Sequence, residues 1–568
     1  MYTAGTAFLE ALYECGVRYL FANLGSDHPA IVESMEEGKV AGREIPTLIT
    51  CPNEMVALSA AQGYAQVTGQ AQAVLVHVEC GTQALAGAVH NIAKGRVPVL
   101  IFAGASPFTQ EGELRGSRNE FIQWIQDVHD QRGIVRGYTR YDNEIRTGRN
   151  VKQLVYRAMQ FACSDPKGAS YLTGAREVME EEVPRVVLDT SQWQPISPCA
   201  IPDEGLDSLI EDLASARHPV VVTSFLGRNT NAVTELLKLV ERLAIPVLES
   251  VPSYVNIPTN HPMYLGNQWN APKQNAVLAE ADLVLVIDSD VPWIPMVNRP
   301  SADARVYYID VDPLKEQMPL WYIPSKRAFR ADACTALKQI NRRLEGVVID
   351  ETAVAERRSV IEARHRRRDE ALRASEVERE VITSEYLTAC VREFVDENTI
   401  VCNEGISNYD VIINHLGIST PGGMIASGGG SLGWNGGAAI GVKLACPEKT
   451  VVAMCGDGSY MFTVPSSVHW MARRYQTPFV QIVFNNGGWK SPKLSTLAVH
   501  PDGYASRADD IGVKFDQPSD YAGIASAAGG ALGLTVSSPH EVRDALAQAF
   551  AAVRSGRCAV LDVKLAPL

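Results

Sequence analysis

Two polar motifs in residues 455–488 carry side chains that could hold a metal ion and a phosphate group. Asp457 stands between two glycines, directly after the apolar run TVVAMC, and Asn486 ends an asparagine pair directly after the apolar run FVQIVF. A carboxylate and an amide carbonyl are hard oxygen ligands of the kind that Mg²⁺ takes in proteins. Both motifs are also common turn compositions, so two ordinary turns are the alternative interpretation.

The apolar runs before these motifs predict β-strands, and the segment SSVHWMARRY between them predicts a helix. A right-handed crossover through such a helix makes the two strands neighbours, and ligands of parallel sheets lie beyond the carboxyl ends of the strands. We therefore expect Asp457 and Asn486 to converge on one point. Gly456, Gly458 and Ser459 would offer close backbone approach, N–H groups and a hydroxyl to an anion there.

Apolar runs alternate with helical patterns along the whole chain, which indicates parallel sheets covered by helices. We therefore predict an α/β fold of three doubly wound parallel-sheet domains, at residues 1–190, 195–345 and 380–568. The first domain's predicted strands are RYLFANL, AVLVHV, VPVLIFAG and RVVLD. The charged segment 355–380 mixes opposite charges with helix formers, and we interpret it as a solvated linker helix.

Length, charge and cysteine usage limit the class of protein. A chain of 568 residues is too long for one core, and a net charge of −13 argues against nucleic acid or an anionic membrane as the main partner. No apolar stretch reaches the roughly 18–20 residues that span a bilayer. The N-terminus lacks the basic region of a signal peptide, and the 11 scattered cysteines contain no CxxC pair. We expect a cytoplasmic protein with reduced thiols and no membrane partner.

The order GDGS, then NN after one helix and one strand, resembles the cofactor motif of thiamine diphosphate-dependent enzymes. Over essentially its whole length the chain is similar to the acetolactate synthase, benzoylformate decarboxylase and pyruvate decarboxylase-like branch of that family. The resemblance implies pyrimidine-binding, central and diphosphate-binding domains, in that order. It implies thiamine diphosphate and Mg²⁺, with Asp457, Asn486 and the carbonyl of Gly488 as metal ligands. It also implies a homodimer or homotetramer with active sites at the subunit interface.

Three further segments match this family. CPNEMVALSAAQGYAQVTG places Glu54 on the glutamate that hydrogen-bonds the aminopyrimidine, so that its imino group can deprotonate the thiazolium carbon. A helix N-terminal acid stabilised by the dipole is the alternative for Glu54. SGGGSLGWNGGAAIG places Leu432 on the apolar residue that supports the bent cofactor, although it could be an ordinary core leucine. NEGISNYD resembles the phosphate loop and adds Ser407 and Asn408 as cofactor-lining candidates.

The first-domain pocket resembles that of benzoylformate decarboxylases. VHVECGTQALAG places His77 on their proton-transferring histidine, and NLGSDHPA places Ser26 on their substrate-carboxylate serine. A buried structural histidine is the alternative for His77, and Asp27 and His28 read as ordinary loop residues. The second decarboxylase histidine of these relatives falls near Pro295, where this chain has none.

Two departures narrow the expected activity. DSDVPW stands where true acetolactate synthases carry a substrate-guiding arginine, and LGRNTNAV is no GxGxxG fingerprint, which argues against bound FAD. The expected function is thiamine diphosphate- and Mg²⁺-dependent C–C cleavage or formation on a 2-keto acid or related carbonyl compound, by an acetolactate synthase-like carboligase or decarboxylase. A benzoylformate decarboxylase-like or 2-hydroxyacyl-CoA lyase-like lyase is one alternative, and a catalytically silent binding subunit is another. The intact set of Glu54, Asp457 and Asn486 argues against the silent subunit.

Overall fold

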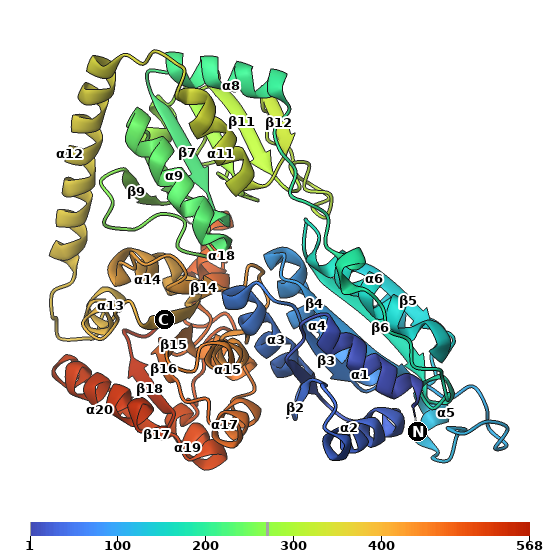
Figure 1. The fold of residues 1–568 in the computed structure, drawn as a ribbon. Coiled ribbons are helices and arrows are strands. Elements are labelled where there is room, and N and C mark those ends of the chain that lie inside the picture. The colour runs from blue at the N-terminus through green and yellow to red at the C-terminus, as the bar shows by residue number, and fades with distance from the viewer. Residues whose placement is uncertain (1, 269–271) are drawn as a thin grey trace. The chain divides into compact units, whose positions relative to one another are not determined.

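The computed structural model describes residues 2–268 and 272–568 and divides the chain into two compact units (Figure 1). The first unit comprises Met1–Ile196, Ser427–Val536 and Ala545–Leu568. The second comprises Ser197–Ala426 and Ser537–Asp544. Each unit contains parallel strands with helices packed on them, and the candidate catalytic residues of the N-terminal and C-terminal motifs lie in the first.

The N-terminal part of the first unit is a six-stranded parallel sheet in the order β2-β1-β3-β4-β6-β5. Its strands are β1 Tyr19–Ala22, β2 Thr47–Thr50, β3 Gln72–Val76, β4 Val99–Ala105, β5 Thr139–Ile145 and β6 Ala169–Ala175. Its helices are α1 Ala4–Glu14, α2 Pro29–Ala41, α3 Glu54–Thr68, α4 Val78–Gly95, α5 Ile122–Ile125, α6 Val151–Cys163 and α7 Arg176–Met179. Helices α1, α2 and α6 form one core with alternate strand residues, while α3 and α4 pack against β3 and β4 (Figure 1).

The C-terminal part of the first unit holds four parallel strands in the order β15-β16-β18-β17. Helix α17 connects β15 to β16, so the crossover and the strand neighbours predicted around the GDG and NN motifs are confirmed. The strands are β15 Thr450–Gly456, β16 Val480–Asn485, β17 Leu532–Val536 and β18 Ala559–Lys564. The helices are α15 Asn435–Ala445, α16 Asp457–Phe462, α17 Pro465–Arg474, α18 Lys490–Val499, α19 Tyr521–Gly529 and α20 Val542–Arg554.

Helices α3 and α15 join these two parts through faces made of small residues. A Cβ atom added at Gly437 would lie 2.9 Å from the Val56 carbonyl oxygen, and one at Gly63 would lie 2.7 Å from Ala438 Cα. A Cβ atom at Gly441 would collide with the carbonyl oxygen of Ala60. The backbones therefore touch directly, and this contact fixes the helix that begins at Glu54.

Replacing Gly441 by Ala is expected to destabilise the protein by about 1–3 kcal/mol, because backbone atoms of α3 cannot yield to the new methyl group. The measurement is the urea midpoint of unfolding, followed by circular dichroism. Gly137→Ala is the matched control, because a Cβ atom at Gly137 meets nothing within 4 Å. Equal midpoints for the two variants would contradict the close packing of α3 on α15.

The second unit contains a six-stranded parallel sheet in the order β12-β11-β10-β7-β8-β9, with an apolar core on each face. Its strands are β7 Pro219–Thr223, β8 Val247–Glu249, β9 Tyr264–Asn267, β10 Leu283–Ile287, β11 Arg305–Asp310 and β12 Arg327–Arg330. The parallel pair β13 Thr399–Glu404 and β14 Met424–Ala426 belongs to the same unit. Its helices are α8 Asp203–Ser215, α9 Thr230–Leu243, α10 Ala276–Glu280, α11 Ala333–Leu344, α12 Glu351–Ser375, α13 Ser384–Arg392 and α14 Tyr409–Leu416.

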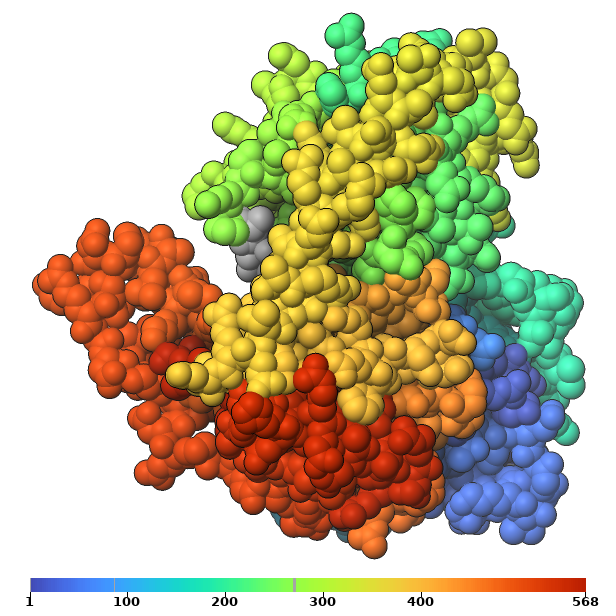
Figure 2. Space-filling view, turned by 90° about the vertical axis from the view of Figure 1, so that its left-hand side faces the viewer, coloured from blue at the N-terminus to red at the C-terminus, as the bar shows by residue number. Residues whose placement is uncertain are grey.

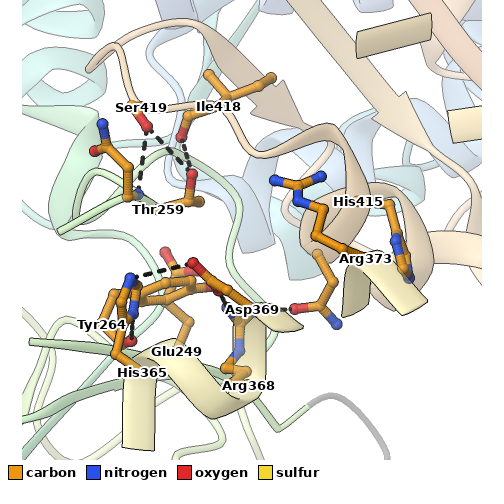
Figure 3. Close-up of polar contacts among 12 residues, drawn as sticks. Glu249, Thr259, Tyr264, His365, Arg368, Asp369, Arg373, His415, Ile418 and Ser419 are labelled. Atoms are coloured by element: carbon orange, nitrogen blue, oxygen red, sulfur yellow. Dashed lines mark hydrogen bonds and ion pairs between the residues drawn. The ribbon is translucent and has the colours of Figure 1, made fainter. Parts of the chain in front are cut away.

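The charged segment predicted as a helix is α12, which lies on the surface of the second unit (Figure 2). One face is not solvated, because Arg357 Nε donates to the carbonyls of Leu243 and Ala244 at the end of α9, at 3.1 and 3.0 Å. Figure 3 shows the C-terminal half of α12, where His365 Nδ1 lies 2.8 Å from the Tyr264 carbonyl and Arg368 donates to Asn414 Oδ1 at 2.6 Å. Helix α12 therefore contacts both β9 and α14.

The predicted fold class is confirmed, since the chain forms parallel-sheet α/β layers throughout. The predicted strand RVVLD is wrong, because residues 185–189 form no strand and Val187 is 86 % exposed. The first sheet instead continues from β4 through β6 and β5, and the apolar runs of the sequence predicted neither of these two strands. The predicted domain boundaries stay a prediction. Within residues 2–268 and 272–568, no helix combines the length and apolarity needed to cross a membrane.

Candidate functional site

The structure brings the GDG and NN motifs together at the carboxyl ends of β15 and β16. The two strands pair in parallel as far as Gly456 and Phe484, and Asp457 begins α16 one residue later. Asp457 Oδ2 accepts a hydrogen bond from the Gly488 N–H at 2.9 Å, while Oδ1 accepts from the Gly458 N–H at 2.8 Å. The carboxylate is 2 % exposed, and its burial raises its pKa above the ordinary value.

The side-chain amide of Asn486 lies close to both the Asp457 carboxylate and the Gly488 carbonyl oxygen. One terminal atom of this amide lies 3.3 Å from Asp457 Oδ1 and 2.9 Å from the Gly488 carbonyl oxygen. With the amide nitrogen turned inward, both contacts are hydrogen bonds. With the amide oxygen turned inward, three oxygen atoms face one point, which is the arrangement that a divalent cation stabilises.

These donors suit Mg²⁺ better than a softer metal. Among the described residues no group of three His, Cys, Asp or Glu side chains could hold a metal ion, so a cation here would need amide and carbonyl oxygens beside the Asp457 carboxylate. Gly488 has φ +151°, and a Cβ atom there would collide with the Val513 carbonyl oxygen, so the orientation of this carbonyl requires glycine. Asp457, Asn486 and Gly488 therefore fit the predicted cation, and their role stays a prediction.

Next to these ligands lies a cavity of about 460 Å³ within the first unit. It is lined by Gly458, Met461, Phe462, Trp489, Phe515, Gln517, Ser519 and Tyr521. The Trp489 indole packs on Gly458, where a Cβ atom would lie 2.7 Å from the ring. Ser459 is buried in the first turn of α16, and Gly456 precedes that helix. The space that a side chain at residue 458 would need is thus occupied by the Trp489 ring, which explains the glycine there.

The other predicted cofactor-binding residues lie in two places. Leu432 is half-buried and follows a loop held by Asn91, whose amide bonds both the N–H and the carbonyl of Ser431, at 3.1 and 2.9 Å. Ser407 and Asn408 belong to the second unit, where the Asn408 side chain accepts from Ser384 Oγ at 2.7 Å. Their contribution to a cofactor site stays a prediction.

Glu54 is the first residue of α3, and its neighbour Asn53 caps the helix by accepting from the Val56 N–H at 3.1 Å. The side chain is half-buried. Its Oε1 atom lies 3.4 Å from the place where a Cβ atom at Gly81 would stand, so Glu54 faces the first turn of α4. The charge of this carboxylate acts on His77, and both interpretations of Glu54 fit the position.

His77 ends β3 and precedes α4, and both of its ring nitrogens have partners. Its Nδ1 atom lies 2.5 Å from Asp27 Oδ1, and its Nε2 atom lies 2.9 Å from Gln126 Oε1. The hydrogen bond with Asp27 raises the pKa of His77 above its ordinary value. Ser26 is half-buried beside Asp27, and its predicted contact with a substrate carboxylate stays a prediction.

From the sequence we expected Asp27 to be an ordinary loop residue, and Gln126 was not predicted as a site residue. Burial opposes the ionisation of Asp27, but His28, His77 and the N–H of Val78 outweigh it and lower the pKa of the carboxyl. The sequence offered one signal for Asp27, because it is an acid directly before His28 in the loop that follows a predicted strand. Gln126 follows the four-residue helix α5 and lies far from His77 in the sequence, so no local pattern could have found it.

Comparisons with known proteins show which protein family the chain is similar to. The N-terminal, central and C-terminal domain families of the thiamine pyrophosphate enzymes match residues 2–134, 206–340 and 405–563. A 2-hydroxyacyl-CoA lyase of Oryza sativa subsp. japonica is 24 % identical over 98 % of this chain and 94 % of the relative. An acetolactate synthase of Bacillus subtilis is 22 % identical over 95 % and 90 %. The structure of a thiamine diphosphate-dependent 4-hydroxybenzoylformate decarboxylase of Rhodococcus jostii shares the fold, with a TM-score of 0.78 and 21 % identity over 100 % of this chain and 99 % of that one.

The three matched domains follow one another in the expected order from residue 2 to residue 563, and the relatives align over nearly their whole length. The chain therefore belongs to the thiamine pyrophosphate enzymes.

Proposed function

We propose that the protein is a thiamine diphosphate- and Mg²⁺-dependent enzyme that cleaves or forms a C–C bond next to a carbonyl group of a 2-keto acid or related compound. The observation that carries this proposal is the convergence of Asp457, Asn486 and Gly488 on one point at the ends of β15 and β16. When bound, the cofactor supplies a carbanion that adds to a carbonyl carbon.

Each group of the chain has a defined task in this proposal. Asp457, Asn486 and the Gly488 carbonyl would hold Mg²⁺. Glu54 would share a proton with the pyrimidine ring, and Leu432 would support the cofactor. Ser26 binds the substrate carboxylate, and His77 moves a proton to or from the substrate. Such placed acid–base groups each contribute about 10²–10⁴-fold to a rate.

A non-oxidative lyase is the second candidate, and the pair of His77 and Asp27 favours it. A lyase or decarboxylase that releases an aldehyde must protonate the carbon that has lost its partner, whereas a carboligase must keep that proton away. The 2.5 Å contact between His77 Nδ1 and Asp27 Oδ1 supports His77 as that proton donor. The similarity to a 2-hydroxyacyl-CoA lyase over 98 % of this chain is consistent with that candidate.

The assembly and the setting complete the proposal. We expect a cytoplasmic homodimer or homotetramer in which two subunits share each active site, with a small carbonyl compound as substrate. The silent binding subunit is disfavoured, because Glu54, Asp457 and Asn486 are all present. Sedimentation at the concentration used for assays tests the assembly, and a monomer with full activity would contradict it.

The deciding experiment measures CO₂ release and product identity with protein supplied with thiamine diphosphate and Mg²⁺. The substrates are pyruvate, benzoylformate, 2-ketobutyrate and longer 2-keto acids, each with and without an acceptor aldehyde. Aldehyde as product supports decarboxylation with protonation, and a hydroxyketone supports carboligation. Release of CO₂ from no substrate, with cofactor demonstrably bound, would direct the assay to 2-hydroxyacyl-CoA substrates. Inactivity on these as well would overturn the proposal.

A further inference from the structure

Three buried side chains, those of Asp27, His28 and Gln126, form a cluster with the imidazole of His77 in the first unit. Asp27 and His28 come from the loop after β1, His77 ends β3, and Gln126 follows α5. Asp27 is 4 % exposed and His28 is fully buried. The cluster therefore joins three segments of the first domain around one carboxylate.

The carboxylate of Asp27 is surrounded by groups that favour its ionised form. Oδ1 faces His77 Nδ1 at 2.5 Å, and Oδ2 accepts from the Val78 N–H at 3.0 Å. The Gly25 N–H donates to His28 Nδ1 at 3.0 Å, so the hydrogen of neutral His28 is on Nε2, which lies 3.2 Å from Asp27 Oδ2. Burial lowers the pKa of His28, whereas the hydrogen bond with Asp27 raises that of His77, so His77 is the better candidate for the counter-charge. A buried carboxylate with only neutral neighbours would be costly, and His77 is the group that can supply a positive charge.

Both ring nitrogens of His77 face oxygen atoms that accept hydrogen bonds. Nδ1 faces the Asp27 carboxylate, and Nε2 lies 2.9 Å from the amide oxygen of Gln126. The amide nitrogen of Gln126 is turned the other way, 3.5 Å from Cys80 Sγ. A neutral imidazole has one N–H and would leave one of these acceptors facing a lone pair, whereas imidazolium satisfies both.

Two glycines in the surrounding backbone leave room for the side chains of Asp27 and His77. A Cβ atom at Gly25 would overlap His77 Nδ1, and one at Gly104 would overlap Asp27 Oδ2. Val78, the residue after His77, has φ +35°, a strained conformation for a β-branched residue. Strain of this kind persists where the surroundings enforce it, and here the Val78 N–H bonds to Asp27.

We propose that Asp27 is a positioning residue that holds His77 as an imidazolium, with Gln126 receiving the Nε2–H that His77 delivers to substrate. In the reaction the Nε2–H bond breaks, the proton forms a new C–H bond at the substrate carbon that has lost its partner, and the electron pair of the N–H bond stays on Nε2. His77 is then neutral, its Nδ1–H still donated to Asp27, and water returns a proton to Nε2. The catalytic step rests on the proposed function, whereas the ion pair itself does not.

The other titratable groups near this cluster are Glu54 on α3, Glu79 and Cys80 on α4, and Tyr171 on β6. The charge of Glu54 acts in the same direction as Asp27 and raises the pKa of His77, by a smaller amount. Burial raises the pKa of Tyr171 to about 12, so this phenol is neutral. The thiol of Cys80 bonds to Glu79, which raises its pKa, so it is also uncharged near pH 7. The charge of Arg132 also acts on Tyr171, but this arginine pairs with Asp142 at 3.1 Å.

The test is a titration of His77 by NMR in protein without cofactor, with histidine-selective ¹⁵N labelling and His77→Gln to assign the signal. Wild-type His77 is expected to stay protonated on both nitrogens well above the ordinary pKa of about 6.5. Asp27→Asn is expected to lower its midpoint by about 1–3 pH units, because an opposite charge at this distance favours the charged ring by that much. A wild-type midpoint at or below about 6.5 would overturn the ion pair.

Two further variants keep the test decisive. Asp130→Asn is the matched control, since Asp130 pairs with Arg136 on the exposed surface, and His77 should titrate there as in the wild type. Gln126→Leu keeps Asp27 and removes the acceptor of Nε2, so it should lower the midpoint even if Asp27→Asn fails to fold. An unchanged midpoint in Gln126→Leu would contradict the assigned role of Gln126.

Activity gives a second readout. A proton donor loses its function as pH rises through its pKa, so the alkaline limb of the kcat profile should move to lower pH in Asp27→Asn by the shift that NMR measures. Alkaline limbs that coincide in wild type and variant, with the NMR midpoints separated, would overturn the proton-donor role. Absence of turnover on every carbonyl substrate overturns the proposed function alone, because the titration uses no cofactor and no substrate.

Discussion

Glu54→Gln is expected to lower kcat by about 10²–10⁴-fold while leaving cofactor affinity within a few-fold of the wild type. Glutamine has the size of glutamate and can still hydrogen-bond a ring nitrogen, but it cannot share an ionisable proton with it. Glu54 lies at the start of α3, where Asn53 already caps the helix, so the amide should not disturb the fold. The measurements are kcat on the best substrate and thiamine diphosphate affinity by titration calorimetry.

The control for Glu54→Gln is Glu36→Gln, which makes the same change on the exposed face of α2, where Glu36 pairs with Lys39 at 2.5 Å. It should leave kcat unchanged. If Glu54 served only as an acid stabilised by the helix dipole, its replacement would cost about 0.3–1 kcal/mol of stability and no turnover. Retained turnover in Glu54→Gln would therefore return this residue to a structural role and remove the carboxylate from the proposed mechanism.

The parts of the site that the sequence predicted are those where backbone geometry and local composition agree. Asp457 and Asn486 each follow a buried strand, and the helix between them fits a single crossover, so their convergence depends on one strand pairing. Glu54 begins a helix rich in small residues, and the glycines of α15 explain why those residues are small. In both cases a regular element sets the position of the functional group.

The parts that the sequence could not predict depend on contacts between distant segments. The bond of His77 with Asp27 requires the loop after β1 to fold over the end of β3, and Gln126 reaches Nε2 from beyond β4. RVVLD has the composition of a strand but no partner at its position, whereas β5, TRYDNEI, is mostly polar and pairs with β6 along its length. Pairing decides which run becomes a strand, and pairing is a tertiary property.

The two halves of the candidate site make different demands on the chain. In the proposed function the residues at the ends of β15 and β16 hold a cation, which would explain the buried carboxylate and the glycine with φ +151° there. The first-domain cluster must hold a proton on His77, so it uses a second buried carboxylate with an imidazolium as its counter-charge. Each half can therefore be disabled alone, and the variants of one should not alter the signature of the other.

Asp457→Asn is expected to weaken the apparent Mg²⁺ affinity of the holoenzyme by at least about 10–100-fold, a loss that second-sphere changes alone can cause. The variant removes the only carboxylate among the proposed ligands and keeps the side-chain size. Thermal unfolding with increasing Mg²⁺ at fixed thiamine diphosphate gives the affinity. Wild type should gain about 2.7 kcal/mol of stability when the ligand reaches 100 times its Kd, whereas the variant should gain almost none at that concentration.

The matched control for Asp457→Asn is Asp502→Asn, since Asp502 is exposed in the segment after α18, and this variant should be stabilised as the wild type is. Without ligands the comparison reverses, because Asp457 is a buried carboxylate whose pKa burial raises. Neutralising it should leave the ligand-free protein as stable as the wild type, or more stable. A Mg²⁺-dependent stabilisation in Asp457→Asn equal to that of the wild type would mean that the cation binds elsewhere, and the convergence of Asp457, Asn486 and Gly488 would then be an ordinary turn contact.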